Sequence, residues 1–452
     1  MNPAPAVVVA APTSGSGKTT IATGLIGALR RAGSRVAPFK VGPDFIDPGY
    51  HGLAAGRPGR NLDSVLVPED LIGPLYRHGS RDADIAVVEG VMGLFDGRID
   101  ERFTVPARGS TAQVAGLLGA PVVLVVDGRG QSHTIAAVLH GFTTFQQGVR
   151  IGGVILNRIG SPRHEQVLRQ ACEAVGVPVL GAVPRRDELS VPSRHLGLVT
   201  AVEHGAQARA AVTAMTDLVA GTVDIAAVRA LARSAPAGPA WSPAHAVGQP
   251  VSGSPVVAVA AGAAFTFGYA EYDELLRAAG AEVVAFDPLS GALPERTAAL
   301  MLPGGFPEQY SADLSANVKL RQEIRDLSRR APVHAECGGL TYLMDDLDGT
   351  PMCGVLSGSA RFTPGLTLGY RDGVAAVDSA LFSAGERVVG HEFHRTTVDF
   401  GPTRQPAWVL PGAGGKPARD GAVRAGVHAA YLHTHPAAHP WVVRRFVARA
   451  GA

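Results

Sequence analysis

Residues 11–20 constrain the fold of this chain more than any other segment, because they join a glycine-rich turn to a helix start. They follow an apolar run at residues 7–10 and read Ala-Pro-Thr-Ser-Gly-Ser-Gly-Lys-Thr-Thr. A strand, a glycine-rich turn and a helix in this order are typical of a phosphate-binding loop, whose amides face an anion. The usual spacing would place Gly where this chain has Pro12, and a chance Gly/Ser turn is the alternative.

The context favours an ATP site. Lys18 adds a full positive charge, and Thr19 is placed to hold Mg²⁺ beside the β- and γ-phosphates. The expected nucleotide contacts in this segment are Gly15, Ser16, Gly17, Lys18, Thr19 and Thr20.

Apolar runs rich in β-branched residues alternate with helical stretches through the first half of the chain. Such runs indicate a parallel sheet buried on both faces, and therefore an α/β fold. Ligands of these sheets gather at the carboxyl ends of the strands. The runs are residues 36–39, 85–88, 122–126, 151–156 and 177–183.

The segment after the second run, residues 40–51, carries Lys40, Asp44, Asp47 and His51. It is rich in Pro and Gly, so we expect a loop instead of a helix. Its position at a strand end favours a ligand-binding loop, with a solvated turn as the alternative. Lys40 is expected to contact ATP and Asp44 to contact Mg²⁺.

Two further strand ends carry polar side chains. Glu89 can coordinate Mg²⁺ directly or through water, as acids at this position do in other phosphate-loop enzymes. Asn157 could read the edge of a nucleotide base, although Asn is also a common turn former.

A proline-rich stretch without hydrophobic periodicity divides the chain. We expect an ATP-binding domain at residues 1–233, a linker at 234–254 and a second domain at 255–452. The second domain begins with a new α/β pattern: a strand at 256–261, a helix at 269–279 and a strand at 283–286.

The second half carries a candidate nucleophile. Cys337 lies between a short apolar strand and the expected start of a helix, where we expect a thiol that is exposed and has a lowered pKa. Gly304 and Gly305 end another strand, and their amides can stabilise an oxyanion. His433 and His435 are both candidate bases for the thiol.

The bulk composition excludes several classes of function. The charge is nearly balanced, at 41 basic and 39 acidic residues, so we expect neither a nucleic-acid partner nor a membrane surface. Three cysteines form no disulfide framework, and no signal peptide is evident. These features predict a cytoplasmic protein. Cys172 and Cys353 are interpreted as inert core residues.

Together, these motifs resemble the cobyrinic acid a,c-diamide synthase family over nearly the whole chain. Their order is distinctive: Ser14-Gly-Ser-Gly-Lys-Thr-Thr, Lys40-Val-Gly-Pro-Asp, Glu89-Gly-Val-Met-Gly, Pro303-Gly-Gly-Phe-Pro-Glu, Ala335-Glu-Cys-Gly-Gly, Gly390-His-Glu-Phe-His and Tyr431-Leu-His. The resemblance implies a dethiobiotin-synthetase-like ATPase joined to a class I-type glutamine amidotransferase. It implies amidation of the a and c acetate side chains of hydrogenobyrinic or cobyrinic acid during cobalamin biosynthesis.

The resemblance also implies roles for individual residues. Cys337 would be the glutaminase nucleophile, and His433 the residue that activates it. Related amidotransferases have a His-Pro-Glu motif, and His435 occupies the Glu position here, which leaves open what orients His433. Ammonia from L-glutamine would displace phosphate from an acyl phosphate formed with ATP and Mg²⁺.

The loop after the second strand is the candidate for substrate selection. Phe45 stands where many members have Tyr, and Phe45 and Ile46 are too apolar to contact phosphate. We expect these two residues, with Asp47 and His51, to face the tetrapyrrole substrate.

Several alternatives stay open at this point. The substrate could be another tetrapyrrole, such as nickel sirohydrochlorin, and the motifs do not separate cobalt-free from cobalt-containing rings. A different class is a partitioning-type ATPase switch, although that class has a second Lys where this chain has Thr13. A third is a ligase with an inactive amidotransferase half. A homodimer is possible and not readable from the sequence.

Overall fold

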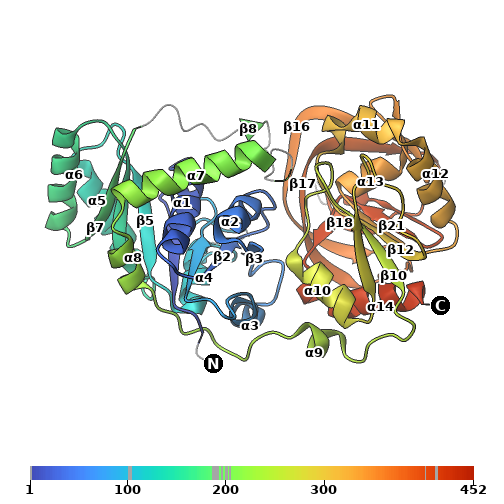
Figure 1. Ribbon diagram of the computed structural model, residues 1–452, viewed down its shortest axis with the longest axis horizontal. Coiled ribbons are helices and arrows are strands. Elements are labelled where there is room, and N and C mark those ends of the chain that lie inside the picture. Colours follow the sequence, from blue (N-terminus) through green and yellow to red (C-terminus); the bar gives the residue numbers. More distant parts are fainter. Residues whose placement is uncertain are drawn as a thin grey trace. The chain divides into compact units, whose positions relative to one another are not determined.

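The computed structural model divides the chain into two compact units, Met1–Trp241 and Ser242–Ala452 (Figure 1). It describes residues 3–99, 104–185, 193–194, 197–198, 202, 205–402, 404–412 and 416–451. Each unit contains a largely parallel sheet with helices packed against it, so the predicted α/β fold class is confirmed.

The sheet of the first unit has the strand order β3-β2-β4-β1-β5-β6-β7, and all of its pairings are parallel. Every residue of β1, β2 and β4 is buried, as expected for continuous apolar runs covered on both faces. The strands are β1 Ala6–Ala10, β2 Val36–Val41, β3 Arg60–Leu62, β4 Ile85–Glu89, β5 Val122–Asp127, β6 Ile151–Ile159 and β7 Val179–Pro184.

The helices of this unit pack in groups: α1 against α2 and α7, α3 against α4, and α5 against α6. Gly24 and Gly27 of α1 allow α7 to approach closely. A Cβ at Gly27, for example, would lie 2.0 Å from Oγ1 of Thr216 in α7. The helices are α1 Lys18–Arg31, α2 Asp47–Ala55, α3 Glu69–Gly79, α4 Thr111–Leu118, α5 Thr134–Thr144, α6 Pro162–Ala174, α7 Gly205–Thr222 and α8 Ile225–Leu231, with short strands β8 Ser193–Arg194 and β9 Gly197–Leu198.

Helix α2 corrects the prediction that residues 40–51 form only a loop. The helix begins at Asp47, and Pro48 occupies its first turn, where the missing N–H would have no intrahelical partner. The carboxylate of Asp44 accepts the amides of Ile46 and Asp47 at 2.6 and 3.2 Å. The same proline that suggested a loop is therefore compatible with a helix start.

The proline-rich connection lies partly against the first unit. The amide of Arg233 donates to Ala6, that of Ala235 to Leu118, and that of Trp241 to Pro74. The indole of Trp241 is buried and packs edge-on against His78. A short helix, α9 Pro243–Val247, follows at the start of the second unit.

The second unit has a six-stranded sheet in the order β11-β10-β12-β13-β21-β20, parallel except for β20. Its strands are β10 Val256–Ala260, β11 Glu282–Phe286, β12 Thr297–Leu302, β13 Val333–Glu336, β20 Ala422–Arg424 and β21 Val427–Ala430. Its helices are α10 Ala270–Ala278, α11 Ser311–Ala316, α12 Val318–Leu327, α13 Gly338–Leu343 and α14 Pro440–Ala450, with 3₁₀ turns η1 Pro307–Gln309 and η3 Pro436–Ala438.

A second sheet in this unit is built on a long antiparallel pair, β16 Leu356–Ala375 and β17 Arg387–Phe400. Its other strands are β14 Met344–Leu347, β15 Thr350–Pro351, β18 Trp408–Pro411, β19 Pro417–Asp420 and β22 His433–Thr434. Strand β22 pairs with β17, which sets His433 opposite His391. The 390–395 motif is thereby brought beside the candidate base.

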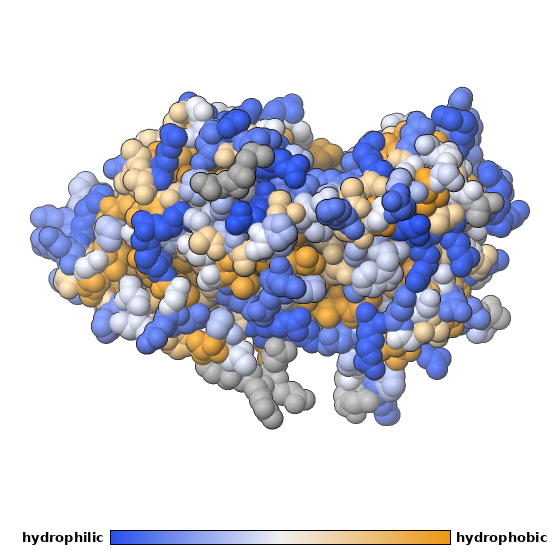
Figure 2. Space-filling view, turned by 90° about the horizontal axis from the view of Figure 1, so that it is seen from below, coloured by the Kyte–Doolittle hydropathy of each residue, from blue (hydrophilic) through white to orange (hydrophobic). Residues whose placement is uncertain are grey.

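The face shown in Figure 2 mixes hydrophilic and hydrophobic residues in small areas. Within the described part of the chain, each helix is too short or too polar to cross a lipid bilayer.

Candidate functional site

The phosphate-binding loop connects β1 to α1 in the first unit. Gly15 and Gly17 have φ values of 76° and 94°, which favour glycine. A Cβ at Gly17 would lie 2.3 Å from Nδ2 of Asn157. The hydroxyl of Ser16 donates to the carbonyl of Thr13 at 2.9 Å and braces the turn. The loop geometry therefore depends on glycine at position 17 for both backbone shape and space.

Lys18 folds back over this loop. Its Nζ donates to the carbonyl of Met92 at 2.5 Å and to that of Thr13 at 3.3 Å. Burial and the nearby ammonium of Lys40 lower the pKa of Lys18. Thr20 lies half-buried in the first turn of α1.

Asn157 supports the loop from the end of β6. Its Nδ2 donates to the carbonyl of Ser16 at 2.9 Å, and its Oδ1 accepts the amide of Arg158 at 2.9 Å. The guanidinium of Arg158 donates to the carbonyl of Gly15 at 2.8 Å. A contact between Asn157 and a nucleotide base stays a prediction.

A cluster of charged side chains lies next to the loop. The Thr19 hydroxyl donates to Oε1 of Glu89 at 2.7 Å and to Oδ2 of Asp47 at 3.3 Å. Nζ of Lys40 lies 3.0 Å from Oδ2 of Asp47 and 3.1 Å from Oε1 of Glu89. Nε2 of His51 lies 2.7 Å from Oε2 of Glu89. Two carboxylates, an ammonium, an imidazole and a hydroxyl thus share one buried site.

Burial and charge pairing shift the pKa values of the groups in this cluster. Burial opposes ionisation of Glu89, but Lys40 and His51 outweigh it and lower its pKa to about 2. Burial and the neighbouring Asp44 raise the pKa of Asp47. Burial opposes the charge of Lys40, whereas Glu89 and Asp47 raise its pKa. Hard oxygen ligands at a buried acidic site are the donors that Mg²⁺ prefers.

The structure brings most of the predicted residues together. Asp47 and His51, which were expected to face the substrate, instead lie against Thr19, Lys40 and Glu89. Asp47, instead of Asp44, lies beside Thr19, because the Asp44 carboxylate caps the start of α2. His51 points at Glu89 and is fully buried, and Phe45 and Ile46 are also buried. Asp47 and His51 are four residues apart, so a predicted helix would have placed them on one face.

In the second unit, Cys337 forms the turn between β13 and α13. Its φ of 49° lies in the left-handed region, which is uncommon for a residue with a side chain. The following glycines let the start of α13 pack closely against the end of β12, since a Cβ at Gly339 would lie 2.1 Å from the carbonyl oxygen of Leu302. The predicted elbow is thus present.

The environment of the thiol differs from the prediction. Cys337 is only 3% exposed, and burial, with Glu308 adding to it, raises the pKa of its thiol. The backbone amides of Gly338 and Gly305 act in the opposite direction. The prediction of an exposed thiol with a lowered pKa is therefore wrong for this structure, because burial outweighs the helix start.

The two predicted glycines at the end of β12 have different surroundings. The amide of Gly305 faces the thiol of Cys337. A Cβ at Gly304 would lie 2.6 Å from Cε1 of His433, so the ring occupies the space that a side chain would need. Gly304 itself is tied to Phe267, whose amide donates to its carbonyl at 3.0 Å.

His433 is fully buried in β22, and its Nδ1 lies 3.3 Å from Oε2 of Glu336. His435 has other contacts: its Nδ1 accepts the amide of Ala437, and its ring lies 4.4 Å from that of Tyr269. The sequence-based reasoning missed Glu336. Its position directly before Cys337 was visible, but its distance from His433 was not.

Comparison with known proteins identifies relatives along the whole chain. A family profile described as the CobQ/CobB/MinD/ParA nucleotide binding domain matches residues 7–199, and one described as the CobB/CobQ-like glutamine amidotransferase domain matches residues 256–441. The chain is 69% identical over 446 residues to a hydrogenobyrinate a,c-diamide synthase of Mycobacterium tuberculosis, with 98% of each chain covered.

Two further relatives extend this comparison. The hydrogenobyrinate a,c-diamide synthase of Streptomyces coelicolor is 53% identical, with 98% of this chain and 97% of the relative covered. The cobyrinate a,c-diamide synthase of Gloeobacter violaceus is 41% identical, with 98% and 96% covered.

Proposed function

The chain belongs to the family of hydrogenobyrinate and cobyrinate a,c-diamide synthases, and we propose that hydrogenobyrinic acid, the cobalt-free ring, is its own substrate. It is a glutamine-hydrolysing ligase that amidates the a and c carboxylates of a corrinoid in cobalamin biosynthesis, using ATP and L-glutamine. The relatives at 69% and 53% identity carry the hydrogenobyrinate name, which supports the cobalt-free substrate.

The observation that carries the reaction scheme is the presence of one chemical site in each unit. A carboxylate is a poor electrophile, because its charge repels nucleophiles and oxide is a poor leaving group. In the first unit, a substrate carboxylate oxygen attacks the γ-phosphorus of ATP, ADP leaves, and an acyl phosphate forms. Ammonia then attacks the acyl carbon and phosphate departs, which leaves the amide.

We propose that Thr19, Asp47 and Glu89 hold Mg²⁺ at the phosphate-binding loop. Their oxygens are neighbours, since the Thr19 hydroxyl lies 2.7 Å from Oε1 of Glu89 and 3.3 Å from Oδ2 of Asp47, and hard oxygen donors suit this ion. Nζ of Lys40 lies beside the same two carboxylate oxygens. When bound, Mg²⁺ neutralises charge on the phosphate oxygens. Among the described residues no three His, Cys, Asp or Glu side chains form a group that could hold a metal ion by themselves. In this proposal, oxygens of the nucleotide would complete the ligand set. Lys18 and Lys40 stabilise the transferred phosphoryl group.

The second unit supplies ammonia. Cys337 attacks the carboxamide carbon of glutamine, and the oxyanion forms beside the amides of Gly305 and Gly338. Because burial raises the pKa of the thiol, a base has to take its proton during attack, and His433 has this role. The proton passes to the leaving ammonia. Water then hydrolyses the thioester to glutamate.

The remaining predictions are kept as proposals. Phe45 and Ile46, together with the start of α2, follow β2 at the carboxyl edge of the sheet, where they would contact the ring or its side chains. A cytoplasmic location and a homodimer are proposed from the sequence, to be read by cell fractionation and light scattering.

One assay tests the proposed function. The purified chain is incubated with ATP, Mg²⁺ and glutamine, with either hydrogenobyrinic or cobyrinic acid, and products are resolved by mass spectrometry. We expect the diamide from hydrogenobyrinic acid at the higher kcat/KM. Faster turnover of cobyrinic acid would overturn the substrate proposal.

A cysteine variant tests whether the second unit only supplies ammonia to the amidation reaction of the first unit. Cys337→Ala should lose glutamine-dependent amidation and retain amidation with ammonium chloride, because only the ammonia source is removed. If a folded Cys337→Ala protein lost both activities, the proposed separation of the two sites would be wrong.

A further inference from the structure

A buried carboxylate lies directly behind the candidate base of the second unit. Glu336 ends β13, one residue before Cys337, and its Oε2 lies 3.3 Å from Nδ1 of His433. Both side chains are buried. The two residues are 97 positions apart in the chain, so this contact depends on the placement of β22.

His435 cannot supply this contact, although it occupies the position that carries Glu in related amidotransferases. Its Nδ1 accepts the amide of Ala437 at 3.3 Å and so caps the turn η3. Its ring packs against Tyr269. A neutral imidazole engaged in this way also lacks the fixed negative charge that would stabilise an imidazolium.

Glu336 is itself held in place through its other oxygen. Oε1 accepts from the hydroxyl of Tyr272 at 3.2 Å and from the amide of Thr434 at 3.3 Å, and it lies 3.4 Å from Nε2 of His334. Oε2 is left for His433. This division of contacts fixes the carboxylate plane and aims one oxygen at the base.

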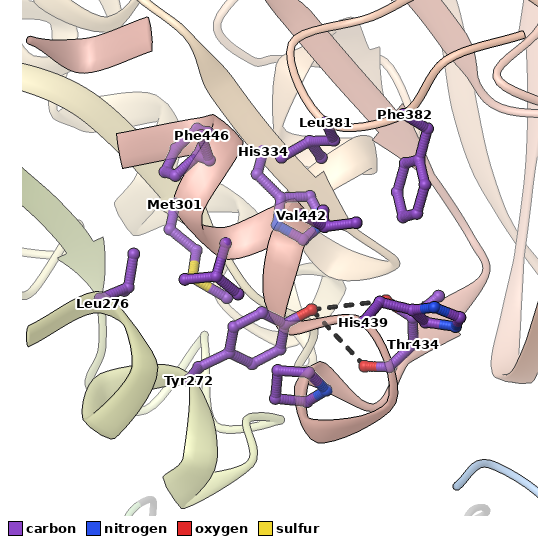
Figure 3. Close-up of a pocket in the computed structure, with 12 residues that line it drawn as sticks. Tyr272, Leu276, Met301, His334, Leu381, Phe382, Thr434, His439, Val442 and Phe446 are labelled. Atoms are coloured by element: carbon purple, nitrogen blue, oxygen red, sulfur yellow. Dashed lines mark hydrogen bonds between the residues drawn. The ribbon is translucent and has the colours of Figure 1, made fainter. Parts of the chain in front are cut away.

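Figure 3 shows a pocket next to this network, and Tyr272, His334 and Thr434 are among the residues that line it. Hydrogen bonds of 3.5 Å join the Tyr272 hydroxyl to Thr434. The cavity measures about 20 Å³, and the rest of its lining is mostly apolar, including Leu276, Met301 and Phe446. It has room for about one water molecule. Glu336 itself is only 4% exposed, so it is shielded from bulk solvent.

Glu336 carries its charge in this setting. Burial opposes ionisation, but hydrogen bonds from His334 and His433 outweigh it and hold the pKa of Glu336 well below its usual range. The other titratable groups nearby are Glu308, which helps to raise the pKa of Cys337, His391, whose pKa is lowered by burial and by His433, and His428, which lies beside His334.

We propose that Glu336 is the positioning residue for His433. Glu336, which directly precedes the nucleophile in the chain, would then be the third member of a Cys337–His433–Glu336 triad. Glu336 holds a proton on Nδ1 of His433, so that Nε2 accepts the thiol proton as the bond from Sγ to carbon forms. Nε2 then gives that proton to the departing ammonia, while Nδ1–H stays on Glu336. The inference rests on the roles proposed above for Cys337 and His433.

The principal test is Glu336→Gln, which keeps the volume and removes the charge. We expect kcat for glutamine hydrolysis to fall by about 10²–10⁴-fold, with a much smaller change in KM. Amidation with ammonium chloride should stay within about twofold of the unsubstituted enzyme, which also shows that the protein is folded. Glu336→Asp keeps the charge and should retain more activity; it serves as the second variant if Glu336→Gln does not fold.

Two readouts distinguish positioning from a general structural effect. Alkylation of Cys337 by iodoacetamide, followed by mass spectrometry, should require a pH about one to three units higher in Glu336→Gln, because the imidazolium partner of the thiolate loses its stabilising charge. In a His433→Ala background, Glu336→Gln should cause no further loss, because Glu336 acts only through His433.

Each outcome has a defined meaning. The positioning role would be overturned if Glu336→Gln hydrolysed glutamine at the rate of the unsubstituted enzyme and Cys337 were alkylated over the same pH range. It would also be overturned if Glu336→Gln lowered the rate further in the His433→Ala background. Unimpaired hydrolysis by Cys337→Ala or His433→Ala would instead overturn the proposed function itself. The two failures are therefore separable in one set of proteins.

Discussion

Replacing Gly304 by Ala adds a single methyl group, and we expect it to lower the rate of glutamine hydrolysis strongly. The Cβ would lie 2.6 Å from Cε1 and 3.2 Å from Nε2 of His433, and 3.2 Å from Cβ of Phe267. Ordinary contacts to a Cβ begin at 3.4 Å, so the imidazole would have to retreat by about 0.8 Å, the difference between 3.4 and 2.6 Å.

The imidazole of His433 has little space to move away from position 304, because contacts hold it on its other side. Its Nδ1 lies 3.3 Å from Glu336, and its backbone pairs with β17 opposite His391. Displacing a catalytic group by about 1 Å can cost 10²-fold in rate. We therefore expect kcat for glutamine hydrolysis by Gly304→Ala to fall by about 10²-fold, with ammonia-dependent amidation unchanged.

Gly268→Ala is the matched control. Gly268 follows Phe267 in the same part of the unit, and a Cβ there would meet nothing within 4 Å. Glutamate release and amide formation are measured separately for both variants. If Gly304→Ala hydrolysed glutamine as fast as Gly268→Ala, His433 would not be confined by Gly304, and the reasoning would be refuted.

Further predictions follow from the two sites. Lys18→Ala should end all amide synthesis yet leave basal glutamine hydrolysis measurable, and undiminished synthesis at saturating ATP would contradict the phosphate-loop role. Asp47→Ala should lower ATP-dependent turnover by more than about tenfold, whereas Asp44→Ala should chiefly destabilise the start of α2, by about 1 kcal/mol. Equal kinetic losses in the two variants would argue against Asp47 as the metal ligand. Glu336 has a lower pKa in the folded state than its ordinary value of 4.5, so its stabilisation is complete above about pH 4.5 and is lost as the pH falls below it. The difference in free energy of unfolding between the unsubstituted enzyme and Glu336→Gln should therefore narrow from pH 6 to pH 3 in urea titrations, and a constant difference would contradict the shifted pKa.

The sequence alone was sufficient for the two α/β halves, the family and the main reactive groups. Continuous β-branched runs encode buried parallel strands, and the glycines at positions 15 and 17 encode the turn of the phosphate-binding loop, because each signal depends on a few neighbouring residues. Cys337 was identified in the same way, since a strand and a helix start flank it closely. Local patterns of this kind can be interpreted without knowing the order of the strands in the sheet.

Only the tertiary structure decided which side chains meet. Glu336 reaches His433 because β13 and β22 lie close in space. Asp47 lies beside Thr19 in the first turn of α2, in a segment that was expected to be a loop. Burial of Cys337 reversed the predicted direction of its pKa shift. Such contacts join chain segments that are far apart in the sequence, and the desolvation of a titratable group depends on all the atoms packed around it. Neither can therefore be predicted from a local motif.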